Sequence, residues 1–151
     1  MTHSTVRRAI IDDLPQIVAF ILEEAREAEG RPLDRGTVEI GIRTALEDDT
    51  IARYWLLIDD DGNPAGCTSV VREWSDWHAG FYWWIQSMYI APAARGRGHL
   101  TTLLDAVRHA AREDDCLDLR LYVHEGNAAA VRAYEKAEFA PSPYRILTRT
   151  P

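Results

Sequence analysis

The segment spanning residues 90–100 combines residue types that could bind an anion. Two arginines alternate with two glycines in it: Arg95, Gly96, Arg97 and Gly98. Glycine lets the backbone turn sharply and brings N–H groups close to a ligand, and the start of a helix presents unpaired N–H donors. Such a turn suits a pyrophosphate, whose oxygens guanidinium groups can also bind. An ordinary strand-to-helix turn with solvent-facing arginines is the alternative, because the dinucleotide fingerprint is incomplete.

The hydrophobic patterning predicts one mixed α/β (α+β) domain in which this turn follows a central strand. Apolar residues at period two predict strands, and apolar residues at helical spacing predict helices. The expected strands are 5–10, 54–58, 65–74, 81–90, 117–123, one near Phe139, and 144–148. The expected helices are 14–25, capped by Asp12 or Asp13 and ended by Gly30, then 34–47, 100–111 and 127–136. The three strands between 54 and 90 should be antiparallel, and the following strand–helix–strand unit should be parallel, with helices on both faces of the sheet.

The composition is that of an ordinary globular domain. The 151 residues, 46% hydrophobic and 27% charged, fit a single domain over residues 1–151. A formal net charge of -7 argues against nucleic acid as a partner, because phosphate binding needs a basic face. The chain shows no signal core and no apolar run of membrane-spanning length, so we expect no membrane partner and a cytoplasmic location. Cys67 and Cys116 lack metal-ligand spacing, which predicts reduced thiols and no metal.

Three blocks follow one another around the glycine-rich turn. The first, Trp84-Ile-Gln-Ser-Met-Tyr-Ile90, is an aromatic strand, and the second is Arg95-Gly-Arg-Gly98. The third runs from Leu121 to Phe139, where Asn127 opens a helix that carries Tyr134. In order and separation, these blocks resemble the GNAT superfamily of N-acetyltransferases. Two positions depart from the small residues usual there: Leu100 and Glu138.

The resemblance implies that acetyl-CoA is the co-substrate and that its acetyl group passes directly to a primary amine. It also implies a V-shaped opening between the fourth and fifth strands, with a bulge near residues 87–89 that frees a backbone N–H for the thioester carbonyl. Tyr134, otherwise a core aromatic, would protonate the leaving thiolate. The residues implied to bind the co-substrate are Met88, Tyr89, Ile90, Arg95, Gly96, Arg97, Gly98, His99, Leu100 and Asn127. A non-catalytic acyl-CoA sensor of the same fold is the main alternative, ahead of a nucleotide-binding α/β module.

The sequence leaves the general base and the acceptor open. Glu73 is one candidate base. The other candidates are Asp76, His124, a carboxylate of the first helix (Glu23, Glu24 or Glu27), and water. Because the first two helices and the loop after the third strand border the acceptor site in the family, we expect Glu24, Trp74 and Trp77 to contact the acceptor. Carboxylates beside aromatic rings favour a small cationic amine, with peptide amines also open, whereas the two tryptophans could instead form a homodimer contact.

Overall fold

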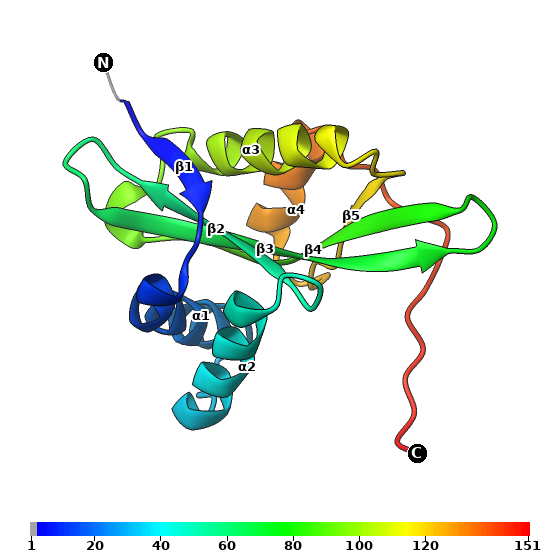
Figure 1. The fold of residues 1–151 in the computed structure, drawn as a ribbon, viewed down its shortest axis with the longest axis horizontal. Helices are drawn as coiled ribbons and strands as arrows, with labels where there is room; N and C mark the ends of the chain where they lie inside the picture. Colours follow the sequence, from blue (N-terminus) through cyan, green and yellow to red (C-terminus); the bar gives the residue numbers. More distant parts are fainter. Residues whose placement is uncertain (1–2) are drawn as a thin grey trace.

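The computed structural model describes residues 3–151, which form a central sheet with helices on both of its faces (Figure 1). The strands are β1 (Thr5–Arg8), β2 (Arg53–Ile58), β3 (Pro64–Ser75), β4 (Gly80–Ile90) and β5 (Leu119–Leu121). The helices are α1 (Leu14–Glu29), α2 (Arg35–Glu47), α3 (His99–Glu113) and α4 (Ala128–Lys136), with short 3₁₀ turns η1 (Ile11–Asp13) and η2 (Pro92–Ala94). In the described part of the chain, no helix has the length and apolarity to cross a bilayer.

The sheet is mixed, as the sequence predicted. The strands lie in the order β1-β2-β3-β4-β5. Neighbours from β1 to β4 pair antiparallel, and β4 pairs parallel with β5. Parallel pairing requires a crossover connection, and α3 supplies it between the last two strands.

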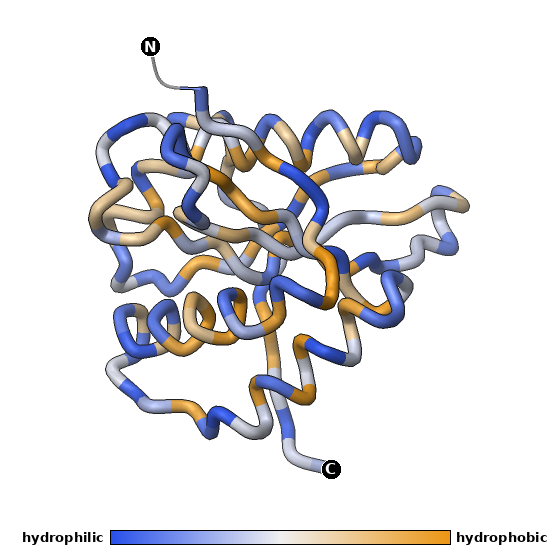
Figure 2. Tube along the Cα trace, turned by 60° about the vertical axis from the view of Figure 1, so that its left-hand side comes forward, coloured by the Kyte–Doolittle hydropathy of each residue, from blue (hydrophilic) through white to orange (hydrophobic). Residues whose placement is uncertain are grey.

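Alternating side chains along the strands hold the two helical layers. In β2, Leu56 packs with α1 and α2, whereas its neighbours Trp55 and Leu57 pack with α3 on the opposite face. This alternation follows from the period-two geometry of a strand. Helices α1 and α2 cover one face and α3 and α4 cover the other (Figure 1). Hydrophilic residues mark the outer side of α3, and apolar residues face the sheet (Figure 2).

A bulge interrupts the pairing of β4 with β3. Ser87 pairs with Ser69, but the next pair is Ile85 with Val70, so Gln86 has no counterpart. The bulge therefore lies one residue before the expected range of 87–89. An extra residue reverses the alternation of side chains. As a result, Ile85 and Met88 both pack on the α3 side of the sheet.

The ladder between β4 and β5 ends at the same point. Only Trp83, Trp84 and Ile85 have partners on β5, which are Leu119 to Leu121. From Gln86 to Ile90, no strand of the described chain pairs with that edge of β4. The expected opening between these two strands is confirmed, and it leaves backbone N–H groups of β4 free for other partners.

The end of α1 and the start of α2 were predicted correctly, but the start of α1 is not capped as expected. Gly30, with φ of 67°, ends α1, and the side chain of Asp34 caps α2 by accepting from the N–H of Thr37 at 2.9 Å. Asp13 precedes α1 but does not cap it with its side chain. Its carboxylate instead accepts two bonds of 2.8 Å from the guanidinium of Arg7.

The predicted strands after α4 are wrong. Residues 137–151 contain no strand, so neither the one near Phe139 nor the one at 144–148 forms. Pro141 and Pro143 lack the N–H that a ladder needs. In addition, β5 spans Leu119–Leu121 rather than the expected 117–123, which leaves a short edge for pairing. Apolar side chains of the tail are consequently exposed: Tyr144, Ile146 and Leu147.

Candidate active site

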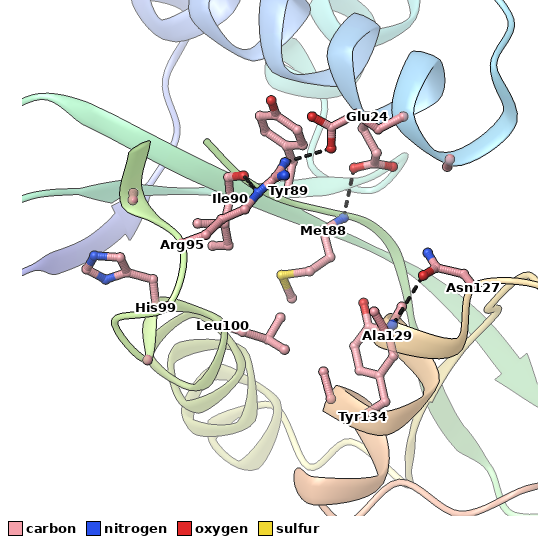
Figure 3. Close-up of a pocket in the computed structure, with 17 residues that line it drawn as sticks. Glu24, Met88, Tyr89, Ile90, Arg95, His99, Leu100, Asn127, Ala129 and Tyr134 are labelled. Atoms are coloured by element: carbon pink, nitrogen blue, oxygen red, sulfur yellow. Dashed lines mark hydrogen bonds and ion pairs between the residues drawn. The ribbon is translucent and has the colours of Figure 1, made fainter. Parts of the chain in front are cut away.

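A cavity of about 490 Å³ lies beside the unpaired part of β4. Its walls come from α1, the end of β4, the turn into α3, and α4 (Figure 3). Every residue predicted to bind the co-substrate lines this cavity except Arg97. Tyr134 and Glu24 line it as well. The volume falls within the range of about 300–1,000 Å³ that is usual for small-molecule sites.

The glycine-rich turn forms one end of the cavity. Gly96 and Gly98 adopt φ of 77° and 79°, a left-handed conformation that other residues rarely adopt. A Cβ atom placed at either glycine would have no neighbouring atom within 4 Å. Gly98 is the N-cap of α3, and no side chain in the described residues caps this helix. The first N–H groups of α3 are therefore available to an anion in the cavity.

His99, the first residue of α3, also borders this end. Only 5% of the surface of His99 is exposed. Its Nδ1 atom has no hydrogen-bond partner among residues 3–151. Buried polar atoms are normally satisfied by protein or water, so this nitrogen is open to a further hydrogen-bond partner.

The two arginines of the turn have different environments. Arg95 binds the carboxylate of Glu27 at 2.6 Å and the carbonyl oxygen of Ile90 at 2.9 Å, and it lies over the ring of Tyr89. These contacts fix the Arg95 side chain between α1 and β4 at the cavity wall. Arg97 is exposed and does not line the cavity. The turn's anion-binding capacity therefore rests on backbone groups more than on the arginines. Leu100 packs against the apolar core on the α3 side.

Glu24 of α1 reaches the free edge of β4. The backbone N–H of Met88 donates to Oε2 of Glu24 at 3.1 Å, as Figure 3 shows. Burial raises the pKa of the Glu24 carboxyl to about 7, and the bond from Met88 opposes this shift. The Met88 N–H, one of those at residues 88–90 that the resemblance implies for the thioester carbonyl, thus has a carboxylate as its partner in this structure.

Tyr134 and Asn127 face the cavity from α4. Asn127 caps the helix, since its side chain accepts from the N–H of Ala130 at 3.2 Å. The hydroxyl of Tyr134 points toward β4 near Met88 (Figure 3). Burial and, secondarily, the charge of Glu24 raise the pKa of Tyr134 to about 12, so the phenol is protonated at neutral pH.

Several predicted site residues lie elsewhere. Glu73 is exposed in the outer half of β3, with its carboxylate 3.8 Å from the guanidinium of Arg120. Trp74 and Trp77 belong to the outer end of the β3–β4 hairpin, with 57% and 83% of their surfaces exposed. Of the other candidate bases, neither Asp76, His124 nor Glu23 lines the cavity. The structure brings Tyr134, Glu24 and the residues predicted to bind the co-substrate, Arg97 excepted, around one cavity, but not Glu73 or the tryptophans.

The ion pair between Glu27 and Arg95 was not anticipated from the sequence. Glu24 and Glu27 are three residues apart in α1 and therefore share one helix face. That spacing, together with Ala28, which also lines the cavity, could have indicated that this face of α1 borders the site. Residues 3–151 contain no group of three or more His, Cys, Asp or Glu residues suited to a metal ion.

Comparison with known proteins agrees with this arrangement. The model of the acetyltransferase (GNAT) family matches residues 17–139. A possible acetyltransferase from Clostridium difficile 630 shares 28% identity with a TM-score of 0.91, covering 97% of each chain. Comparison with curated protein sequences gave no match.

Two further solved structures have the same fold as this chain but low sequence identity to it. A ribosomal-protein-alanine N-acetyltransferase from Brucella melitensis biovar Abortus 2308 is 18% identical with a TM-score of 0.82, covering 98% of this chain and 100% of that one. An aminoglycoside N-acetyltransferase in complex with CoA is 13% identical with a TM-score of 0.83, covering 99% of this chain and 96% of that one. The family match covers most of the sequence, including the turn, β4 and α4, and the chain therefore belongs to the GNAT family of acetyltransferases.

Proposed function

We propose that this protein is an acetyl-CoA-dependent N-acetyltransferase that transfers the acetyl group directly to a primary amine. The observation that carries the proposal is the composition of one cavity. At one end lie the uncapped start of α3 and the two left-handed glycines, and farther along lie the Met88 N–H and the Tyr134 hydroxyl. An anion site and a proton donor in one cavity suit a substrate with a phosphate at one end and a thioester at the other.

The residues present fit the co-substrate. The backbone N–H groups from Gly96 to Leu100 would hold the pyrophosphate, and open space at both glycines leaves room for it. The unpaired edge of β4 beyond Ile85 would accept hydrogen bonding from the extended pantetheine arm, as a sheet edge does with a peptide. When bound, acetyl-CoA would supply the activated acetyl group.

The chain would contribute polarisation, proton donation and positioning to the reaction. The Met88 N–H would stabilise negative charge on the thioester oxygen as the amine attacks. Tyr134, protonated at neutral pH, would give a proton to the leaving sulfur. Holding both substrates in one cavity would lower the barrier further, because the encounter becomes intramolecular.

The acceptor we propose is a small cationic amine. The support is the Glu24 carboxylate inside the cavity and the formal net charge of -7, both of which favour an ammonium group. The two N-acetyltransferase neighbours act, by their names, on an aminoglycoside and on a ribosomal-protein alanine, so they do not select between small and peptide amines. Trp74 and Trp77 lie outside the cavity, and acceptor contact in this proposal rests on Glu24.

Thiol release from acetyl-CoA, measured with a panel of amines, tests this function. The panel should include polyamines, aminoglycosides, amino acids and a peptide N-terminus, with a reaction lacking amine as the control. We expect amine-dependent release of CoA with at least one small cationic amine. Binding of CoA without release in the presence of any amine would instead identify a non-catalytic acyl-CoA sensor.

A further inference from the structure

Glu24 is the carboxylate in the cavity that lacks a cationic partner. Its neighbours on α1 are both paired, Glu23 with Arg26 at 2.5 Å and Glu27 with Arg95 at 2.6 Å. No ion pair of Glu24 occurs within residues 3–151, and its one hydrogen bond comes from the Met88 N–H. A partly buried carboxylate without a cation is costly to ionise, and such a group in a cavity is a candidate for a role in proton transfer.

Among residues 3–151, no positively charged side chain pairs with Glu24, and Arg95, which lines the same cavity, is paired with Glu27 instead. The ionisable groups close enough to sense its charge are Tyr54 of β2, Cys67 of β3 and Tyr134 of α4, all neutral at pH 7. On its own helix, Glu27 is engaged by Arg95. This environment accounts for a carboxyl pKa of about 7, at which the group can accept and release protons.

We propose that Glu24 is the general base of the transfer and that, before acetyl-CoA binds, its carboxylate occupies the Met88 N–H that the thioester oxygen then takes. This inference rests on the proposed function. A backbone N–H can serve one strong acceptor at a time, so the thioester carbonyl and the Glu24 carboxylate compete for it. Once displaced, the carboxylate loses the hydrogen bond that stabilised its charged form and becomes a stronger base beside the incoming amine.

The proton transfers balance with two carriers. The ammonium group of the acceptor gives one proton to Glu24, which later releases it to water. The amine nitrogen then forms a bond to the carbonyl carbon, and negative charge on the oxygen is held by the Met88 N–H. As the carbon–sulfur bond breaks, Tyr134 protonates the sulfur and is reprotonated by the second proton that leaves the nitrogen. The products are the amide, CoA with a free thiol, and one proton in solution.

The first test compares the dissociation constants of CoA and acetyl-CoA by calorimetry between pH 6 and pH 8, without amine. Acetyl-CoA, unlike CoA, has a thioester carbonyl, which is the group that competes with Glu24 for the Met88 N–H, and ionised Glu24 competes more strongly than protonated Glu24. In the wild type, the preference for acetyl-CoA over CoA should therefore fall as pH rises through about 7, by up to about tenfold for each unit by which the acetyl group raises the Glu24 pKa. In Glu24→Ala the preference should be independent of pH. Glu23→Gln, a carboxylate of the same helix outside the cavity, should behave as the wild type.

The second test measures turnover with an amine identified by thiol release. Glu24→Gln should lower kcat by about 10²–10⁴-fold and abolish the rise of kcat/KM with pH, while the affinity for CoA stays unchanged. A pH-independent acetyl-CoA preference in the wild type, or wild-type turnover in Glu24→Gln, overturns the inference while leaving the proposed function standing. Absence of CoA binding in all proteins, the wild type included, would instead refute the proposed function itself.

Discussion

Glu24 and Tyr134 approach the free edge of β4 from helices on opposite faces of the sheet. Burial raises the pKa of both side chains, to about 7 for the carboxyl and about 12 for the phenol. Near neutral pH one group can therefore take a proton while the other can give one, which is the separation expected of an acid–base pair. The resemblance to the GNAT family predicted that Tyr134 lies at the co-substrate site, and Tyr134 lines the cavity, whereas the helix pattern alone favoured a core aromatic. The sequence could not separate Glu24 from Glu73, because the choice depends on which carboxylate the fold brings to Met88.

Removing the Tyr134 hydroxyl tests its assignment as the acid. Tyr134→Phe should lower turnover by about 10²–10⁴-fold, because the leaving sulfur loses its proton donor. The ring contact with Phe139, 5.7 Å between centroids, is retained, so folding and CoA affinity should stay unchanged. Steady-state kinetics and calorimetry measure the two quantities. Wild-type turnover in this variant would identify Tyr134 as a core aromatic.

Glu24 should also make stability depend on pH. Its pKa in the folded protein, about 7, lies above the ordinary value of 4.5 for a glutamate, so the folded state holds this proton more tightly than the unfolded state. The contribution of Glu24 to the free energy of unfolding is thus fully present below pH 4.5 and is lost as pH rises through about 7. Glu24→Gln should consequently be more stable than the wild type at pH 8, by on the order of 3 kcal/mol at most, and similar to it at pH 4. Equal free energies of unfolding at pH 8, measured in urea, would show that the carboxylate is not buried at a cost.

At the scale of elements, the bulge in β4 and the turn before α3 shape the site. The resemblance to the family predicted the bulge to within one residue, but its position at Gln86 is set by the register with β3, which local patterning does not contain. The turn was predicted more closely, because its left-handed backbone requires glycine at Gly96 and Gly98, and this requirement is visible in the local sequence. The strand predicted at 144–148 fails for the converse reason: its apolar pattern is local, but a strand also needs a pairing neighbour, and residues 144–148 pair with no strand of the sheet.

Alanine at Gly98 should affect both the fold and the co-substrate site. The left-handed φ of 79° costs an alanine about 1–2 kcal/mol, and the added methyl group would enter space that the cavity leaves open. Gly62→Ala is the matched control, since Gly62 has φ of 84° with equally open surroundings but lies in the β2–β3 turn outside the cavity. Both variants should lose similar stability in denaturant unfolding, and Gly98→Ala alone should bind CoA more weakly. Equal CoA affinity in the two variants would show that the turn at Gly98 does not contribute to CoA binding.

For the whole molecule, the order of elements from β1 to α4 follows from local patterns. Apolar periodicity identified each helix and strand up to Lys136, and the pairing of β4 with β5 followed from the crossover rule. What the patterns could not supply is distance. Three separated segments, residues 24–28, 88–100 and 127–134, meet around one cavity, and the Glu27–Arg95 and Glu24–Met88 contacts join residues more than sixty positions apart in the chain.

Because those segments meet only in the folded chain, CoA should stabilise the protein as a whole. A ligand that binds the native state alone raises the free energy of unfolding by about 2.7 kcal/mol at a concentration of 100 times its Kd. We therefore expect Tm to rise progressively with CoA, measured by differential scanning fluorimetry. The rise should be smaller in Gly98→Ala and unchanged in Glu23→Gln. An unchanged Tm at millimolar CoA would contradict binding to the native state.

The most direct test of the central claim is a crystal structure of the protein with CoA. The account predicts the pyrophosphate within hydrogen-bond distance of the N–H groups from Gly96 to Leu100. It also predicts the pantetheine arm along β4 beyond Ile85, with the sulfur near the Tyr134 hydroxyl. CoA bound elsewhere on the molecule, or this cavity empty at a saturating CoA concentration, would contradict it.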